Sequence, residues 1–362
     1  MKKTKNFVWS MMLAVSAMAF TACSSSDDNG NGGGSITTDE PVTLDAPQNK
    51  AESALYTINS SSSEYSSIEL TESGNYVIIK KSAGAKAMVF DNVEHAGIVT
   101  APWTSEKTRA NAYNNIISGS YTKTDDNTYV LEGFGTIVVT KSGDTAASLQ
   151  ITPEGSSAYT LTASVKTQYP DSEATFRLCR TWKMTAMRLQ LSVSVPDMGN
   201  ETFNYDKTVA GGDIPALMND FYEQMMRWTM NLVNRYAAQY GEQPIPQAEL
   251  NKYMEEELKE TREQIYKQYK SVENIIFTQA GTYMVLYGDQ SLAVATWTWN
   301  DNTNKSLRFS WNYSNMSSAA MSGSCDIQFS GNHCIITETN DASNSTVKNA
   351  GVTLTYQLTE VK

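Results

Sequence analysis

The strongest constraint on this chain is a repeated alternation of apolar and polar residues in short runs that turn residues separate. Such runs are typical of β-strands buried on one face, because successive side chains of a strand point to opposite sides. Six of these runs stand between residues 48 and 166, among them Tyr76–Ile79 and Gly135–Val139. The same pattern returns after residue 274 and continues to the end of the chain. Most of the protein is therefore predicted to consist of antiparallel β-structure.

Two hairpins are predicted in the last third of the chain. Trp297–Trp299 pairs with Phe309–Tyr313 across the polar loop Asn300–Ser306. Ile327–Phe329 pairs with Cys334–Ile336, and Gly331 and Asn332 form the turn between them.

The register of the second hairpin bears on the cysteines. Phe329 faces Cys334, so Cys325 lies four residues further along its strand, about 13 Å away. That separation exceeds the reach of a disulfide. Cys179, Cys325 and Cys334 are predicted to be buried free thiols.

A single region, 213–272, departs from the β-pattern. Apolar residues recur there at steps of three and four, first from Ile214 to Tyr236 and again from Leu250 to Val272. Asp213 and Pro215 suit the start of a helix, and a Gly/Pro-rich segment separates the two stripes. The region is predicted to form a hairpin of two long helices, the first of them roughly 40 Å long.

The charge balance excludes several classes of function. The chain has 28 basic and 39 acidic side chains, and an acidic surface repels nucleic acids. His95 and His333 are its only histidines, so a His-rich metal site is excluded. The sequence contains no nucleophile elbow, phosphate loop or zinc signature. We expect no catalytic residue, no metal and no cofactor other than a covalent lipid, and therefore no enzyme.

The N-terminus has the three parts of a secretory signal. Lys2, Lys3 and Lys5 precede an apolar run, Phe7–Phe20, which is too short to span a bilayer comfortably. Residues 1–22 are predicted to be a signal peptide. The polar, Gly-rich stretch 23–47 is predicted to be a flexible tether. Removal of 1–22 leaves 25 basic and 39 acidic side chains, a net charge of −14.

Cys23, placed directly after Thr21 and Ala22, resembles the acylated cysteine of a bacterial lipoprotein, although Phe20 stands where such signals usually have Leu. Serines followed by Asp27 and Asp28 resemble the surface-export signal of Bacteroidota lipoproteins. The resemblance implies palmitate-type acyl and diacylglycerol chains on Cys23. It places the protein at the outer membrane, lipid-anchored and exposed at the cell surface. Asp144–Ala146 resembles an O-glycosylation acceptor of the same bacteria, which makes Thr145 a candidate for modification.

An internal similarity suggests two modules. Leu70–Val77 aligns without gaps onto Phe277–Met284, and Ser120–Asp125 resembles Thr296–Asp301. We interpret the chain as two related β-modules, 48–170 and 171–362. The alternative is that hairpins resemble one another in general.

A family resemblance accompanies this division. Arg180–Lys183 resembles the Gly-x-Trp opening of lipocalin-like domains, with Arg180 in the place of the glycine. Phe277–Tyr283 and Thr296–Trp299 resemble the lipocalin-like lipoproteins of Bacteroidota. The resemblance implies a mainly β protein, α+β overall. It has two antiparallel lipocalin-like barrel or half-barrel modules, and the helical hairpin 213–272 is inserted in the second.

Two interpretations of the aromatic residues remain open. They fill the barrel core, or they line a cavity for a small apolar or glycan ligand. The candidates are Trp182, Tyr283, Trp297, Trp299 and Trp311. We expect a binding protein whose partners are the membrane, through its anchor, and a small ligand or a surface protein, but no nucleic acid. The alternatives are a subunit of a surface complex that docks through the helical hairpin, and a carbohydrate-active enzyme.

Overall fold

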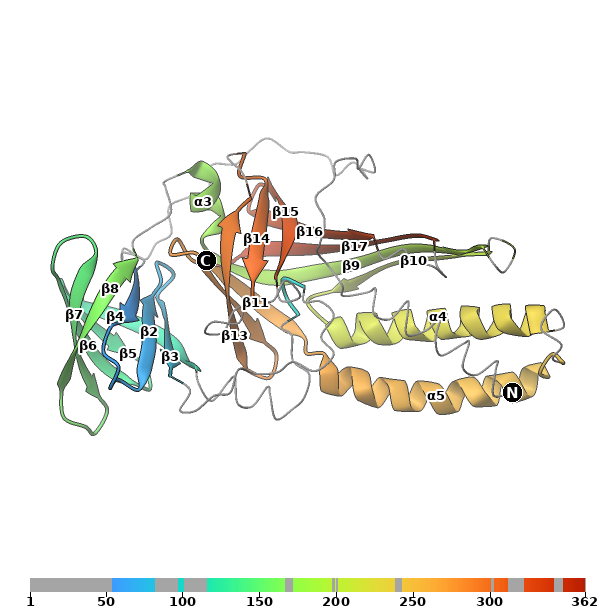
Figure 1. The fold of residues 1–362 in the computed structure, drawn as a ribbon, viewed down its shortest axis with the longest axis horizontal. Coiled ribbons are helices and arrows are strands. Elements are labelled where there is room, and N and C mark those ends of the chain that lie inside the picture. Colours follow the sequence, from blue (N-terminus) through green and yellow to red (C-terminus); the bar gives the residue numbers. More distant parts are fainter. Residues whose placement is uncertain are drawn as a thin grey trace.

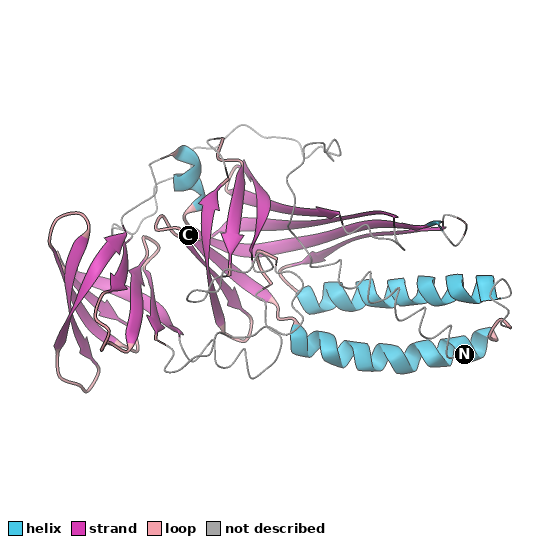
Figure 2. Ribbon diagram, viewed as in Figure 1, coloured by secondary structure: helices cyan, strands magenta, loops and turns pink. Residues whose placement is uncertain are grey.

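The computed structural model describes residues 54–81, 97–100, 116–166, 172–196, 199, 201–237, 243–300, 303–311, 322–341 and 348–361. The predicted signal peptide, Cys23, the predicted tether and His95 lie outside these residues. The described chain forms two closed antiparallel barrels and a helical hairpin, so the predicted fold class is confirmed (Figures 1 and 2).

The first barrel consists of eight strands in sequence order, and β1 pairs with β8 to close it. The strands are β1 (Ala54–Ile58), β2 (Tyr65–Leu70), β3 (Asn75–Lys80), β4 (Ile116–Asp125), β5 (Thr128–Leu131), β6 (Gly135–Lys141), β7 (Ala146–Pro153) and β8 (Tyr159–Lys166). Every second side chain points inward, as the alternating sequence requires. The core is apolar and includes Tyr56, Ile68, Tyr76, Ile137 and Leu149.

The second barrel has the same order, but a helical insertion follows its first hairpin. Helix α3 (Glu173–Leu178) precedes it. Its strands are β9 (Thr181–Val195), β11 (Val272–Phe277), β12 (Thr282–Tyr287), β13 (Leu292–Trp299), β14 (Ser306–Ser310), β15 (Ser322–Ser330), β16 (His333–Asp341) and β17 (Lys348–Glu360). β9 pairs with β17 and closes the barrel.

An extension of the sheet carries the helices. The second half of β9 projects beyond the barrel and pairs with β10 (Glu201–Ala210) on one edge and β17 on the other. Helices α4 (Ile214–Tyr236) and α5 (Gln247–Gln268) run alongside this extension (Figure 1). Phe203 and Tyr205 of β10 pack against Phe221 of α4, which buries the apolar stripe of that helix.

The structure differs from the sequence prediction at two element boundaries. The sequence predicted no helix before Arg180, whereas Glu173–Leu178 is helical. Ser172 caps this helix by accepting a hydrogen bond from the Thr175 amide. Val272 was placed on the second helix, but it begins β11, because α5 has ended before Tyr269 takes an extended conformation.

The predicted correspondence between the modules is present in the turns that follow β2 and β11. In Thr71–Asn75 and in Thr278–Thr282, the first amide donates to the last carbonyl at 2.9 Å. Gly74 and Gly281 occupy the same place in the two turns, with φ of 78° and 84°. Only glycine adopts such angles without strain.

The residues that pack on these turns correspond as well. The Tyr121 hydroxyl donates to the Thr71 carbonyl at 2.6 Å, and the Trp297 indole donates to the Thr278 carbonyl at 3.1 Å. The sequence alignment had matched Tyr121 with Trp297. Both modules therefore hold this turn with an aromatic donor from the same strand position.

The outer faces of the two barrels meet. Val77 of the first barrel packs with Ile276, Met284 and Val294 of the second in one apolar cluster. The Thr278 hydroxyl also donates to the Glu69 carboxyl at 2.6 Å across this contact. The two barrels are thus joined by apolar packing and a buried hydrogen bond.

We predict that Gly74→Ala and Gly281→Ala each lower the free energy of unfolding by about 1–3 kcal/mol, because each puts a Cβ at positive φ. Urea unfolding measures this change. Gly351→Ala is the matched control, since its Cβ would have open space and its φ is not positive. An equal loss in all three variants would contradict the prediction.

Candidate functional site: the interior of the second barrel

The predicted aromatic residues gather inside the second barrel. Trp182, Tyr283, Trp297 and Trp311 are at most 1% exposed, and Trp299 is half-buried at the barrel's edge. Tyr283 packs edge-on against Trp311 at 5.3 Å between ring centroids, and Trp297 against Trp299 at the same distance. These side chains fill the middle of the barrel with close aromatic contacts.

Helix α3 covers the end of the barrel at which β9 begins. The Trp182 indole donates to the Leu178 carbonyl at 2.8 Å, and the Trp299 indole donates to the Thr175 hydroxyl at 2.9 Å. Arg180 is buried and binds Glu360 at 2.5 Å. This ion pair connects the beginning of β9 to the end of β17, next to the seam that closes the barrel.

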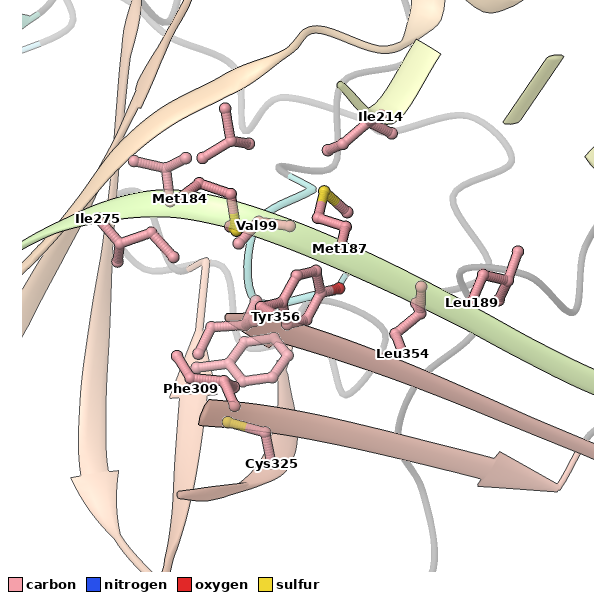
Figure 3. Close-up of a cluster of buried hydrophobic side chains, with 14 of the residues drawn as sticks. Val99, Met184, Met187, Leu189, Ile214, Ile275, Phe309, Cys325, Leu354 and Tyr356 are labelled. Carbon is pink, nitrogen blue, oxygen red and sulfur yellow. The ribbon is translucent and has the colours of Figure 1, made fainter. Parts of the chain in front are cut away.

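A segment of the other module occupies the far end. Gly97–Thr100, called the plug from here on, belongs to the connection between β3 and β4 of the first barrel. Ile98 and Val99 are fully buried and belong to the core of the second barrel. Figure 3 shows Val99 among side chains of that core, beside Met184, Met187 and Tyr356.

The barrel binds the plug through the plug's main chain. The Trp311 indole donates to the Gly97 carbonyl at 2.9 Å. The Ile98 amide donates to Glu338 Oε1 at 3.0 Å. The Tyr287 hydroxyl donates to the Val99 carbonyl at 3.0 Å. Three side chains from three parts of the barrel therefore recognise three consecutive plug residues.

The plug is also a tight turn in its own right. The Gly97 amide donates to the Thr100 hydroxyl at 2.9 Å, and the Thr100 amide donates to the Gly97 carbonyl at 3.3 Å. A Cβ on Gly97 would lie 2.7 Å from Thr100 Oγ1 and 3.2 Å from Glu338 Oε2. A side chain at the first position of the turn would therefore displace the Thr100 hydroxyl and crowd Glu338.

Glu338 is a buried ionisable side chain at this end of the barrel. It is 1% exposed, and the Tyr356 hydroxyl donates to its Oε2 at 2.5 Å. Burial raises the pKa of Glu338 from 4.5 to about 7, against the opposing effect of its bonds from Tyr356 and the Ile98 amide. The same surroundings hold the pKa of Tyr356 well above its ordinary value. The carboxyl thus changes charge near neutral pH.

A second buried carboxyl lies between the barrels. Glu69 is 2% exposed and accepts the Thr278 hydroxyl. Burial raises its pKa to about 7, the bonds from Thr278 and Thr282 lower it, and the nearby Glu72 raises it again. Glu69 therefore links the docking of the two barrels to proton binding.

The three predicted thiols belong to the core of the second barrel, and Cys325 lies near Phe309 in the cluster of Figure 3. Cys179, Cys325 and Cys334 are buried free thiols, as expected, and Phe329 pairs with Cys334. Burial raises the pKa of Cys179 and of Cys334, so neither is a reactive thiolate. Thr145 is exposed in the turn before β7. Cys23 lies outside the described residues.

Metal-ligand clusters and membrane-spanning helices are both absent from the described residues. No three His, Cys, Asp or Glu side chains gather there in a way that could hold a metal ion. No helix in this part of the chain combines the length and apolar character needed to cross a membrane.

The helical hairpin presents little apolar surface. Leu217, Phe221 and Met225 of α4 and Leu258 of α5 are at most 2% exposed. Glu223 joins the helices by binding Arg262 at 2.9 Å. Among the described residues, Tyr266 is the one large apolar side chain of the hairpin that is exposed.

A shallow pocket lies beside α3, at the opposite end of the barrel from the plug. Its volume is about 280 Å³, and it is lined by Ser172, Glu173, Thr175, Phe176 and Gln279. Sites for ligands of ordinary size occupy roughly 300–1,000 Å³. The plug end, with its convergent polar groups, is the stronger candidate.

Sequence reasoning missed the residues that bind the plug. Glu338 could have been found, because it alternates with Cys334 and Ile336 and so falls on an inward-facing row. An acid in such a row is a recognisable signal. The plug itself gave no signal, since nothing local relates residues 97–100 to a barrel that begins some 80 residues later.

Comparisons with known proteins give no family. No family model and no curated protein matches the chain. A solved structure of a protein of unknown function of the DUF3598 family, from Nostoc punctiforme, is 9% identical over 85% of this chain and 94% of its own. Its TM-score of 0.16 is too low to indicate a shared fold.

We predict that Glu338→Gln flattens the pH dependence of stability. Below pH 4.5 the carboxyl is protonated in the folded and the unfolded chain alike. As the pH rises from 4.5 to about 7, the unfolded chain loses this proton while the folded chain keeps it, so stability falls. The loss attributable to Glu338 is on the order of 3 kcal/mol.

Urea unfolding of the wild type and the variant between pH 4 and 8 measures this difference. Glu69 titrates in both proteins, so its effect cancels. Glu256→Gln, at an exposed position on α5, is the control and should follow the wild type. Parallel curves for Glu338→Gln and the wild type would show that Glu338 does not titrate in this range.

Proposed function

We propose that this protein is a non-catalytic, lipid-anchored binding protein of the bacterial cell envelope, and that its ligand site is the plug end of the second barrel. The observation that supports this most strongly is the set of buried side chains that bind the plug. The backbone of a closed barrel forms its hydrogen bonds within the barrel wall. The side chains of Glu338, Tyr287 and Trp311 instead form hydrogen bonds with a segment that is not part of this wall.

The surroundings of the site favour a ligand with apolar groups. Met184, Met187, Phe309 and Leu354 belong to the core cluster that contains Val99 (Figure 3). An apolar wall with a few convergent polar groups is the ordinary composition of a ligand site. Docking through the helical hairpin is less well supported, because its apolar stripes pack within the chain.

The N-terminal sequence supports the proposed anchor and location. Cys23 follows a signal-like segment, and the Gly-rich stretch 23–47 would hold the barrels away from the membrane. Several acyl chains on one cysteine give stable attachment where a single chain is marginal. A body with a net charge of −14 gains no attraction from anionic lipids, so attachment would depend on Cys23.

We predict that Cys23→Ser abolishes lipid attachment in a bacterial host that acylates lipoproteins. The wild type should incorporate an alkyne-labelled palmitate and sediment with membranes, and the variant should do neither. Ser24→Ala is the matched control and should behave as the wild type. A Cys23→Ser protein that still carries the label would exclude this anchor.

We predict that the double variant I98D/V99D opens the site. An aspartate cannot be buried unpaired at either position, so the plug leaves the barrel. The folded variant should bind about one molecule of the fluorescent apolar probe anilinonaphthalene sulfonate per chain, and the wild type none. Near-ultraviolet circular dichroism of the buried tryptophans verifies that the barrel is intact.

Val130→Asp is the control, because Val130 is an exposed apolar residue of the first barrel. It should bind no more probe than the wild type. A folded I98D/V99D protein that binds no probe would mean that the barrel closes over the vacated space, and the proposed ligand site would be wrong.

A further inference from the structure

The contacts at the plug end specify what kind of molecule fits there. All three hydrogen bonds from the barrel go to main-chain atoms: the carbonyls of Gly97 and Val99 and the amide of Ile98. The side chains of Ile98 and Val99 fill apolar space inside the barrel and are fully buried. The site thus combines two donors and one acceptor, spaced for a polypeptide, with an apolar wall.

Other ligand classes match this arrangement poorly. A fatty acyl chain would fill the apolar space but offer no partner along its length to the Trp311 indole or to Glu338 Oε1, and unpaired buried polar groups are costly. A saccharide could bond to these groups, but its hydroxyls would stand where Ile98 and Val99 now pack. A peptide satisfies both requirements at once.

We propose that the second barrel is a recognition site for a tight peptide turn with a glycine followed by two apolar residues, and that the plug is an internal occupant which such a turn of a partner protein replaces. This proposal rests on the proposed function and names its ligand class. The glycine is favoured because a Cβ at Gly97 would displace Thr100 Oγ1 and crowd Glu338 Oε2.

Glu338 argues for an exchangeable occupant rather than a permanent tie between the barrels. Apolar residues of similar shape hold a permanent contact as well as a buried charge does, or better. The Glu338 carboxyl accepts hydrogen bonds from the Ile98 amide and the Tyr356 hydroxyl. It therefore favours an occupant that places a main-chain N–H where Ile98 has its own. The site therefore selects its occupant by main-chain hydrogen bonding as well as by apolar contact.

The plug competes with any incoming turn. A segment tethered to its own site acts at an effective concentration on the order of millimolar. An isolated peptide at micromolar concentration is therefore excluded from the wild-type barrel and admitted when the plug is disabled. This difference separates binding at the plug end from binding elsewhere on the protein.

The test uses the full mature chain and a fluorescent peptide, Ala-Gly-Ile-Val-Thr-Ala, closed into a ring by terminal cysteines. Fluorescence anisotropy measures its binding to I98D/V99D, to Val130→Asp and to the wild type. Two matched peptides accompany it: one carries N-methyl-isoleucine, which lacks the N–H that Glu338 accepts, and one has alanine in place of glycine. If I98D/V99D does not fold, I98A/V99A replaces it.

We expect I98D/V99D to bind the parent peptide at least ten-fold more tightly than the wild type and Val130→Asp do. Both altered peptides should bind I98D/V99D about ten-fold more weakly or worse, because each loses a main-chain bond or meets a steric clash. Equal binding of the parent and N-methyl peptides, or equal binding by the variant and the wild type, would overturn the proposal. A variant that binds the apolar probe but not the peptide refutes the peptide class alone, whereas one that binds neither also refutes the ligand site.

Discussion

The second barrel and everything attached to it depend on the pairing of β9 with β17. This ladder runs from the Trp182–Glu360 pair to the Ser194–Lys348 pair, so one edge of β9 is occupied along nearly its whole length. Its other edge is shared, first by β11 and then by β10. A single strand therefore closes the barrel and supports the extension on which α4 packs. Closure also removes the exposed edges that make β-proteins aggregate at a surface.

Two buried carboxyls join this barrel to the first module. Glu69 belongs to the first barrel and accepts a hydroxyl of the second, while Glu338 belongs to the second barrel and accepts an amide of the first. Each contact places an acid in a dry environment, which raises its pKa to about 7. The association of the modules is consequently coupled to proton binding at two points, one in the interface and one in the barrel interior.

Local pattern predicted most of the fold, because strands, hairpins and helices are read from residues that are near one another in sequence. The Phe329–Cys334 register and the matched turns at Gly74 and Gly281 were found in this way. The plug was not, since its partners Glu338 and Trp311 are more than 200 residues away. A contact of that separation has no periodicity to reveal it. The helix before β9 was missed for a different reason: its six residues are too few to show a helical repeat.

The two modules share a strand order but differ in where they carry extra chain. The connection between β3 and β4 is long and sends the plug into the second barrel, whereas the equivalent connection between β12 and β13 is a tight turn after Tyr287. The inward row of β7 is apolar throughout, from Ala147 to Ile151, whereas the equivalent β16 carries Glu338. The polar groups and the segment that needs them therefore occur in different modules. Each makes its contacts with the other module, so the second barrel holds a segment that is not part of its own wall.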